Sequence, residues 1–402
     1  MKRLMIFLVF SLMMLAQTPI VQASGENEPN INSESAVMID AKTGDILYQK
    51  NSADKMYPAS ITKIVTGILA IESGKLNESV IVSGNAAKAD GTRVYLVEGE
   101  KVPLKKLVQG LLINSGNDAA IAIAEYLADD IPSFADKMND FAKKVGANHT
   151  HFVNPNGLFD VEHYTTAEDM AKITQYAMRN KEFREIVSTK ELPWVGEGWK
   201  TTLRNHQQLL WDYPGTIGVK NGYVDESKHT LVTAVSREGL DVIIVTMKGP
   251  SSKASYWDTM SIGDYGFQNF ERQTIPAGTE IKVHDGKKYA LKEDLMVTLP
   301  KGEKPIKHVT SKGKLQLKNA EGKVLLTHKL FEEKPVKAAA VSTATKSAEE
   351  AGTPTFFHQV VKASVYLYSG LLILLAFLVI MRMRSQKVRH KRMRRVARSY
   401  VK

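Results

Sequence analysis

Residues 58–73 read PASITKIVTGILAIES and predict a buried helix that opens on a serine. Apolar side chains recur there every three or four residues, as expected for a helix with an apolar face. Ser60 and Lys63 lie one turn apart at its start, where the unpaired amides of a helix carry positive partial charge. Burial lowers the pKa of a lysine, and a neutral lysine can accept the proton of a serine. The pair therefore indicates a nucleophile and its base.

Context separates this Ser-x-x-Lys pair from two others in the chain. The same spacing occurs at residues 52–55, in a polar stretch, and at residues 311–314, in a region of short strand-like runs. Only the pair at residues 60–63 opens an apolar helix. A structural interpretation stays open, in which Ser60 caps the helix and Lys63 lies on a solvated face, because serine is a favoured N-cap.

Strands on either side of the helices predict a single sheet. Residues 36–40 and 45–50 form one expected hairpin, and residues 229–236 and 240–247 form another. Helices are expected between and after them, at 103–113, 117–127, 133–145, 166–179 and 252–268. Composition and spacing thus indicate the fold class α/β (α+β), with one sheet built from the early and late strands and a helical insert.

The chain changes character after about residue 275. Short apolar runs alternate there with glycine-containing and charged turns, and strands are expected at 280–283, 295–299, 314–317 and 323–328. Residues 275–331 therefore predict a small all-β domain. Residues 334–357, rich in Ala, Ser, Thr, Lys and Glu, predict a flexible linker.

The two ends of the chain predict export and a membrane anchor. Residues 1–23 have the order of a secretory signal peptide, with Lys2 and Arg3 before an apolar run and a small-residue exit. Residues 363–381 carry no charge and are long enough to cross the hydrocarbon layer. Residues 382–402 hold ten Lys/Arg and no acid, which places this tail in the cytoplasm. We therefore expect a single-pass protein of the cell membrane, with its catalytic domain extracellular and its basic tail against membrane lipid.

The net charge of +11 arises from the two ends of the chain. The predicted signal peptide and the basic tail account for all of it, and the central part of the chain is close to neutral. We therefore expect no nucleic-acid partner. The chain has no cysteine, which excludes thiol catalysis, thiolate metal sites and disulfides. The histidines fit no metal-ligand spacing, so neither a metal nor a cofactor is expected.

Two further segments carry polar side chains suited to a cleft. Ser115 and Asn117 flank a glycine between two predicted apolar helices, and could present a hydroxyl and an amide. Residues 220–223 read Lys-Asn-Gly-Tyr, and a glycine on an edge strand leaves room for a substrate backbone alongside. Taken alone, a loop and a surface turn explain these segments equally well.

In order and spacing, the three segments resemble the motifs Ser-x-x-Lys, Ser-x-Asn and Lys-Thr-Gly of the low-molecular-weight penicillin-binding proteins, the serine D-Ala-D-Ala carboxypeptidases. Residues 151–158 and 163–169 resemble further recurrent segments of that family. The resemblance covers residues 34–270. It implies a penicillin-binding/β-lactamase-like fold, an antiparallel sheet flanked by helices, with the small β domain that follows in many members. The transmembrane helix predicted from hydropathy departs from the family, because many relatives lie on the membrane with a C-terminal amphipathic helix.

The resemblance also implies an activity: removal of the terminal D-alanine from peptidoglycan stem pentapeptides. Ser60 would attack the carbonyl between two D-alanines, with Lys63 as its base. Ser115, with Lys220 nearby, would relay the proton to the leaving D-alanine. Water would then hydrolyse the acyl-enzyme. β-Lactam antibiotics would acylate the same serine and leave it slowly.

The implied substrate site follows from the same resemblance. Asn117 would hold an amide of the stem peptide, and the backbone amides of Ser60 and Tyr223 would form the oxyanion hole. The implied substrate-binding residues are Asn117, Lys220, Asn221, Gly222 and Tyr223.

Two positions depart from the family pattern, both at the carboxylate end of the site. Asn221 stands where the family has a threonine that helps bind the terminal carboxylate, although an asparagine amide is also a donor. Residues 251–258 include Lys253 but lack the arginine that many members carry there. These departures leave open a weakly active wall-binding or scaffold protein. A β-lactamase or endopeptidase of the same fold is a second alternative, and a β-lactamase would need a group such as Asp160, Glu162 or Glu168 to activate the deacylating water.

Overall fold

The computed structural model describes residues 28–282, 288–311 and 313–330. The predicted signal peptide, linker, transmembrane helix and basic tail lie outside these residues. Among the helices in the described ranges, none is both long enough and apolar enough to cross a bilayer.

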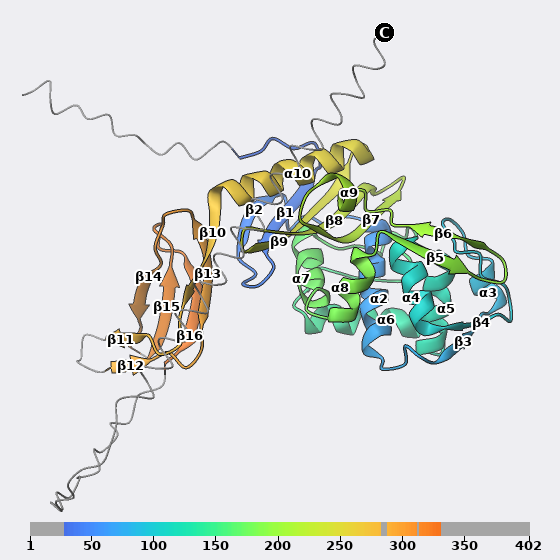
Figure 1. Cartoon of the computed structure of the whole chain (residues 1–402), viewed down its shortest axis with the longest axis horizontal. Coiled ribbons are helices and arrows are strands. Elements are labelled where there is room, and N and C mark those ends of the chain that lie inside the picture. The colour runs from blue at the N-terminus through green and yellow to red at the C-terminus, as the bar shows by residue number, and fades with distance from the viewer. Residues whose placement is uncertain (1–27, 283–287, 312, 331–402) are drawn as a thin grey trace, which may run out of the picture. The chain divides into compact units, whose positions relative to one another are not determined.

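A five-stranded antiparallel sheet forms the centre of the N-terminal domain (Figure 1). Its strands are β1 (Ser35–Asp40), β2 (Ile46–Lys50), β7 (Thr216–Val224), β8 (Lys228–Arg237) and β9 (Leu240–Gly249), in the order β2-β1-β9-β8-β7. The first strand pairs with the last, with Val37 opposite Val245. One sheet built from the early and late strands is therefore confirmed.

The helices fill the sequence between β2 and β7 and follow β9. They are η1 (Ala59–Thr62), α2 (Lys63–Glu72), α3 (Gly84–Ala87), α4 (Leu104–Ile113), α5 (Asn117–Leu127), α6 (Ile131–Lys144), α7 (Ala167–Ala177), α8 (Lys181–Ser188), α9 (Leu209–Asp212) and α10 (Ser252–Asn269). Two short hairpins accompany them, β3 (Ser79–Ile81) with β4 (Lys101–Pro103) and β5 (Glu191–Val195) with β6 (Lys200–Arg204).

Both faces of the central sheet are apolar, because side chains alternate along each strand. On β1, Val37 and Ile39 belong to one core cluster, whereas Ala36 and Met38 belong to another. The first cluster includes residues of α2 and α7, and the second includes Ile262 of α10. Figure 1 shows α10 on one side of the sheet and the helical insert on the other. The buried insert is what places η1 and α2 against the strands.

Most predicted helices are confirmed, with small shifts at their ends. Helix α6 begins two residues earlier than expected because Asp130 caps it, accepting the amide hydrogen of Ser133 at 2.7 Å. The helix predicted from Ser60 requires a correction. Residues 59–62 form a 3-10 turn, and the α-helix begins only at Lys63.

A smaller β domain follows α10. Its strands are β10 (Phe270–Ile275), β11 (Glu280–Lys282), β12 (Lys288–Ala290), β13 (Leu295–Pro300), β14 (Ile306–Val309), β15 (Lys314–Lys318) and β16 (Val324–Lys329). They pair as β10-β13, β11-β12 and β14-β15-β16 around an apolar core of their own. Strands predicted at 280–283, 295–299, 314–317 and 323–328 coincide with β11, β13, β15 and β16 to within two residues.

A buried ion pair ties the β domain to the sheet. The Nε and Nη2 atoms of Arg272 on β10 contact the carboxylate of Asp40 on β1 at 2.8 and 2.9 Å. Thr298 on β13 donates its hydroxyl to the same carboxylate at 2.6 Å. Since a bidentate arginine–carboxylate contact is directional, it fixes where β10 meets the end of β1.

Candidate active site

The turn η1 places the hydroxyl of Ser60 beside the amine of Lys63. Lys63 Nζ donates to Ser60 Oγ at 2.8 Å and to the carbonyl oxygen of Asn156 at 2.7 Å. Ser60 makes no side-chain cap, and Lys63 is fully buried. The interpretation of the pair as a cap and a solvated lysine is therefore wrong. Ser60 itself is only partly buried, so a substrate can reach it.

The surroundings of Lys63 favour its neutral form. Burial first, and then the positive charge of Lys220, lower the pKa of Lys63 well below the ordinary value for lysine. The carboxylate of Asp118 opposes this shift. A neutral amine within hydrogen-bond distance of a hydroxyl is the arrangement that a lysine base requires.

A loop at residues 153–163 covers the Ser60 turn, and sequence reasoning did not indicate its contact with Lys63. Gly157 has a φ of +83°, and a Cβ there would lie 1.9 Å from the carbonyl oxygen of Ala59. The next residue back, Asn156, accepts the hydrogen bond from Lys63 through its backbone. Only glycine fits this close crossing of two chain segments.

His163 fixes the same loop to the turn from the side. Its Nδ1 accepts the amide hydrogen of Val153 at 3.1 Å, and its Nε2 lies 2.8 Å from the hydroxyl of Thr62. Because Nδ1 accepts, Nε2 carries the proton and donates to Thr62. Burial lowers the pKa of His163 to about 4, so the ring adds no positive charge near Lys63 at neutral pH.

Ser115 lies in the turn between α4 and α5, and both helices pack against α2. Its φ of +64° is uncommon for a residue other than glycine, and such strained residues gather at functional sites. The side chain is nearly buried. Over the described part of the chain its hydroxyl has no hydrogen-bond partner, so it is available for proton transfer.

Asn117 has a partner that the sequence did not indicate. Its Nδ2 donates to the carbonyl oxygen of Asp90 at 2.5 Å. The buried carboxylate of Asp118 accepts the amide hydrogen of Val94 at 3.0 Å. These bonds hold the segment after α3 against the start of α5. They leave only the oxygen of the Asn117 amide, and one of its hydrogens, for a substrate.

Strand β7 forms the edge of the sheet, as expected for the Lys-Asn-Gly segment. Gly222 lies directly against the Ser60 turn, since a Cβ there would lie 2.6 Å from the backbone nitrogen of Ser60. Lys220 is buried, and its Nζ donates to the carbonyl oxygen of Asn221 at 2.8 Å. Burial lowers the pKa of Lys220 to about 7. The strand thus brings a lysine of shifted pKa and an open backbone edge to the nucleophile.

Tyr223 is half-exposed at the same edge. Its ring lies 4.7 Å from the ring of His229 on β8, and its hydroxyl donates to Asp225 at 2.7 Å. These contacts keep the side chain turned along the strand. The contribution expected of Tyr223 is its backbone amide, which follows Gly222 directly.

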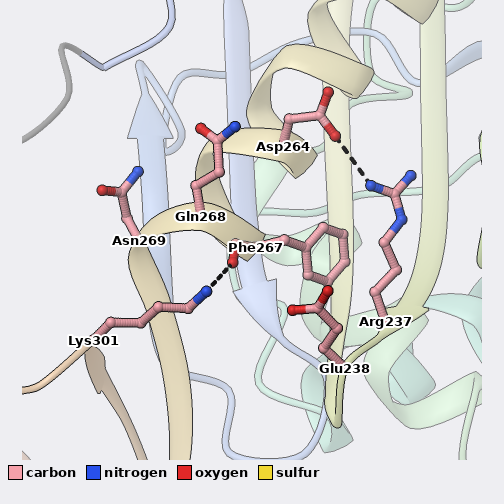
Figure 2. A pocket seen from close by; sticks show the side chains of 7 residues that line it. All are labelled: Arg237, Glu238, Asp264, Phe267, Gln268, Asn269 and Lys301. Atoms are coloured by element: carbon pink, nitrogen blue, oxygen red, sulfur yellow. Dashed lines mark hydrogen bonds and ion pairs between the residues drawn. The ribbon is translucent and has the colours of Figure 1, made fainter.

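A hollow in the surface lies away from Ser60. It has a volume of about 580 Å³ and is lined by Arg237, Glu238, Asp264, Phe267, Gln268, Asn269 and Lys301 (Figure 2). Arg237 ends β8, roughly 20 Å along the strand from Thr230, which contacts the Ser60 turn. Three of its four charged groups already have partners: Arg237 pairs with Asp264 at 3.1 Å, and Lys301 donates to the carbonyl oxygen of Phe267 at 2.7 Å. Neither here nor elsewhere in the described ranges do three His, Asp or Glu side chains gather as a metal site would need.

Comparison with known proteins shows which family has a sequence similar to the segment that carries these residues. The family model described as D-alanyl-D-alanine carboxypeptidase (Peptidase S11) matches residues 22–251, more than half of the chain. The chain belongs to this family. Among curated members, it is 31% identical to the D-alanyl-D-alanine carboxypeptidase DacF of Bacillus subtilis, over 89% of this chain and 97% of that protein. It is also 31% identical to DacA of Haemophilus influenzae, over 69% of this chain and 75% of that protein.

Solved structures of the family agree with the fold. Penicillin binding protein 5 from Haemophilus influenzae superposes with a TM-score of 0.68 at 27% identity, over 76% of this chain and 98% of that chain. Penicillin binding protein 6B from Escherichia coli superposes with a TM-score of 0.63 at 28% identity, over 74% of this chain and 95% of that chain. The mixed α/β penicillin-binding fold is therefore confirmed, and with it the resemblance drawn from the three motifs.

Proposed function

We propose that this carboxypeptidase family member removes the terminal D-alanine from peptidoglycan stem pentapeptides through an acyl-enzyme on Ser60. One observation carries the proposal: a fully buried Lys63 amine lies 2.8 Å from the Ser60 hydroxyl. The membership of the chain in the D-alanyl-D-alanine carboxypeptidase family supports the same reaction.

Acylation begins when Lys63 takes the hydroxyl proton and Ser60 Oγ bonds to the carbonyl carbon between the two D-alanines. The backbone amides of Ser60 and Tyr223 then bind the oxyanion. Support comes from Gly222, which brings the following peptide alongside the Ser60 turn. The carbon–nitrogen bond breaks as Ser115 passes a proton to the leaving amine, and the partnerless hydroxyl of Ser115 suits this relay.

Deacylation needs only water, and Lys63 can accept its proton as it accepted that of the serine. The edge of β7 pairs with the stem peptide, and the remaining polar atoms of Asn117 bind a peptide amide. A β-lactam ring presents a similar acyl group to Ser60 and stays attached longer. Peptidoglycan stem peptides and β-lactams are thus the expected ligands of this site.

We also propose that the protein is exported and anchored by residues 363–381, with residues 382–402 on the cytoplasmic side. The support is the charge and hydropathy pattern of the sequence. Protease added to intact cells should then remove the catalytic domain and spare an epitope placed after Lys402. Loss of that epitope under the same treatment would reject this topology.

Release of D-alanine tests the reaction. The full chain in detergent should release D-alanine from a pentapeptide ending in D-Ala-D-Ala, and Ser60→Ala should release none. Ser311→Ala is the matched control, since it removes the serine of another Ser-x-x-Lys sequence and lies in the β domain. Penicillin labelling without D-alanine release would instead support a wall-binding protein, and rapid loss of the label would support a β-lactamase.

Acylation should have a bell-shaped dependence on pH. The rate should rise with pH on the acid side, as Lys63 loses its proton through its lowered pKa. It should fall above about pH 7, as Lys220 loses the positive charge that attracts a carboxylate. The measurement is the second-order rate constant for acylation by benzylpenicillin from about pH 5 to about pH 9. In Lys220→Arg the alkaline fall should disappear from this range, and an unchanged fall would assign it to another group.

A further inference from the structure

In the sequence, His206 lies between the Ser115–Asn117 motif and the Lys220–Gly222 motif. Its backbone amide donates to the carbonyl oxygen of Ile113 at 3.3 Å, two residues before Ser115. Its own carbonyl oxygen accepts the hydroxyl of Tyr256 at 3.3 Å. The backbone at this position is therefore anchored on one side to the Ser115 turn and on the other to α10.

The two neighbours of His206 anchor it further. Both are buried, and Gln207 Nε2 donates to the carbonyl oxygen of Val232 at 3.1 Å. Val232 is the residue of β8 that pairs with Lys220. The side-chain amide of Asn205 donates to one carbonyl oxygen in the last turn of α8 and to one just after that helix, at 3.1 and 3.0 Å. An exposed side chain thus stands on a rigid segment beside the Lys220 strand, as a binding residue requires.

The His206 side chain combines exposure to solvent with the electrostatic influence of the two site lysines. It is exposed, and its nitrogens have no hydrogen-bond partner among the described residues. Burial nevertheless lowers the pKa of His206 to about 4, with further lowering by the charges of Lys220 and Lys63. The backbone contact with Ile113 and the bond from Gln207 to the partner residue of Lys220 place this exposed ring beside the Ser115 turn and the Lys220 strand.

The terminal carboxylate of the substrate needs donors at this end of the site. Asn221 provides no hydroxyl, and its side-chain oxygen already lies 3.4 Å from Lys220 Nζ. Residues 251–258 provide no arginine. We propose that His206 donates a hydrogen bond to the terminal carboxylate of the substrate, beside Lys220, and so selects free carboxylate ends. This inference rests on the proposed carboxypeptidase function and names a specificity residue for it.

A pair of peptides tests this role directly. One ends in D-Ala-D-Ala with a free carboxylate, and the other has the same sequence with a terminal carboxamide. His206→Ala should lower kcat/KM for the carboxylate peptide by about 10-fold or more, chiefly through KM, because a charge-assisted hydrogen bond is lost. The value for the carboxamide peptide should stay within about twofold. His206→Arg, which restores a donor to the carboxylate, should recover the preference.

His149→Ala is the matched control, because it removes an exposed histidine elsewhere in the same domain. It should leave kcat/KM unchanged for both peptides. Equal losses for the two peptides in His206→Ala would mean a structural role and would overturn the proposal. An unchanged preference in a folded variant would do the same.

Acylation by penicillin keeps this test separate from the carboxypeptidase claim. Benzylpenicillin carries a carboxylate, and its methyl ester lacks that charge. If the parent protein releases no D-alanine but is acylated, the proposed turnover fails, while the ratio of the two acylation rates still decides the role of His206. A ratio that does not fall in His206→Ala would overturn the inference.

Discussion

Lys63→Met should slow acylation of Ser60 by about 10²–10⁴-fold, because positioned general bases contribute that much to proton transfer. The loss should appear equally in D-alanine release and in penicillin labelling, since both begin with the same attack. Methionine is close to lysine in length and occupies the buried channel without a proton-accepting group. The effect should therefore come from chemistry alone and not from a cavity.

Stability separates this expectation from simple unfolding. At neutral pH a lysine with a lowered pKa in the folded state gives up a proton on folding that the unfolded chain would hold, which costs free energy. Methionine removes that cost and loses two hydrogen bonds, each contributing about 1 kcal/mol. The two terms oppose each other, so the melting temperature should change little.

Lys137→Met is the matched control for Lys63→Met. Lys137 is exposed on α6, and the same substitution there should leave both acylation and melting temperature unchanged. Acylation of Lys63→Met at the parent rate would show that another group serves as the base. A collapse of the melting temperature would show instead that the amine is held mainly for its hydrogen bonds.

Periodicity located the elements that carry the site. Helices α4, α5 and α10 were predicted to within a residue. Helices α4 and α5 each bury a continuous apolar stripe, whereas α10 buries mainly small and polar residues and begins after a serine cap. The β5–β6 hairpin was missed because each strand buries a single residue, Trp194 and Leu203. One buried side chain per strand leaves no period to detect.

The candidate catalytic residues could be identified from the sequence for a different reason. The proposed roles of Ser60, Lys63 and Lys220 belong to side chains at recurrent spacings, so sequence alone could nominate these residues. Asn156 acts through its carbonyl oxygen, and any residue type has one. His206 stands out only once the chain is folded, because Ile113 and its other backbone partners are far away in sequence.

Asn117 shows a limit of motif transfer. Its identity fits the pattern, yet one hydrogen of its side-chain amide is donated to the carbonyl oxygen of Asp90, in the segment after α3. Gly91 approaches the same amide so closely that a Cβ there would lie 2.8 Å from Nδ2. The motif residue therefore also positions the segment after α3, and the sequence of that segment carries no signature of this role.

Gly222→Ala should abolish measurable acylation, with a loss of about 10³-fold or more. An added Cβ would lie 2.6 Å from Ser60 N and 2.7 Å from Thr230 Oγ1, distances that real contacts do not reach. The first of these is a backbone atom, so β7 or the turn must move. The oxyanion donors on either side of this contact would then separate, and each donor contributes about 10²–10³-fold.

Two further variants make this expectation decisive. Gly239→Ala places a methyl group in the β8–β9 turn, where nothing lies within 4 Å, so it should cost some stability at its positive φ but no acylation. Thr230→Ala added to Gly222→Ala removes one of the two close contacts and should recover stability. The contact with Ser60 N persists in that double variant, so it should fold and stay inactive. Acylation at the parent rate in either Gly222 variant would mean that the strand tolerates displacement, and that the backbone amides of Ser60 and Tyr223 do not form the oxyanion site.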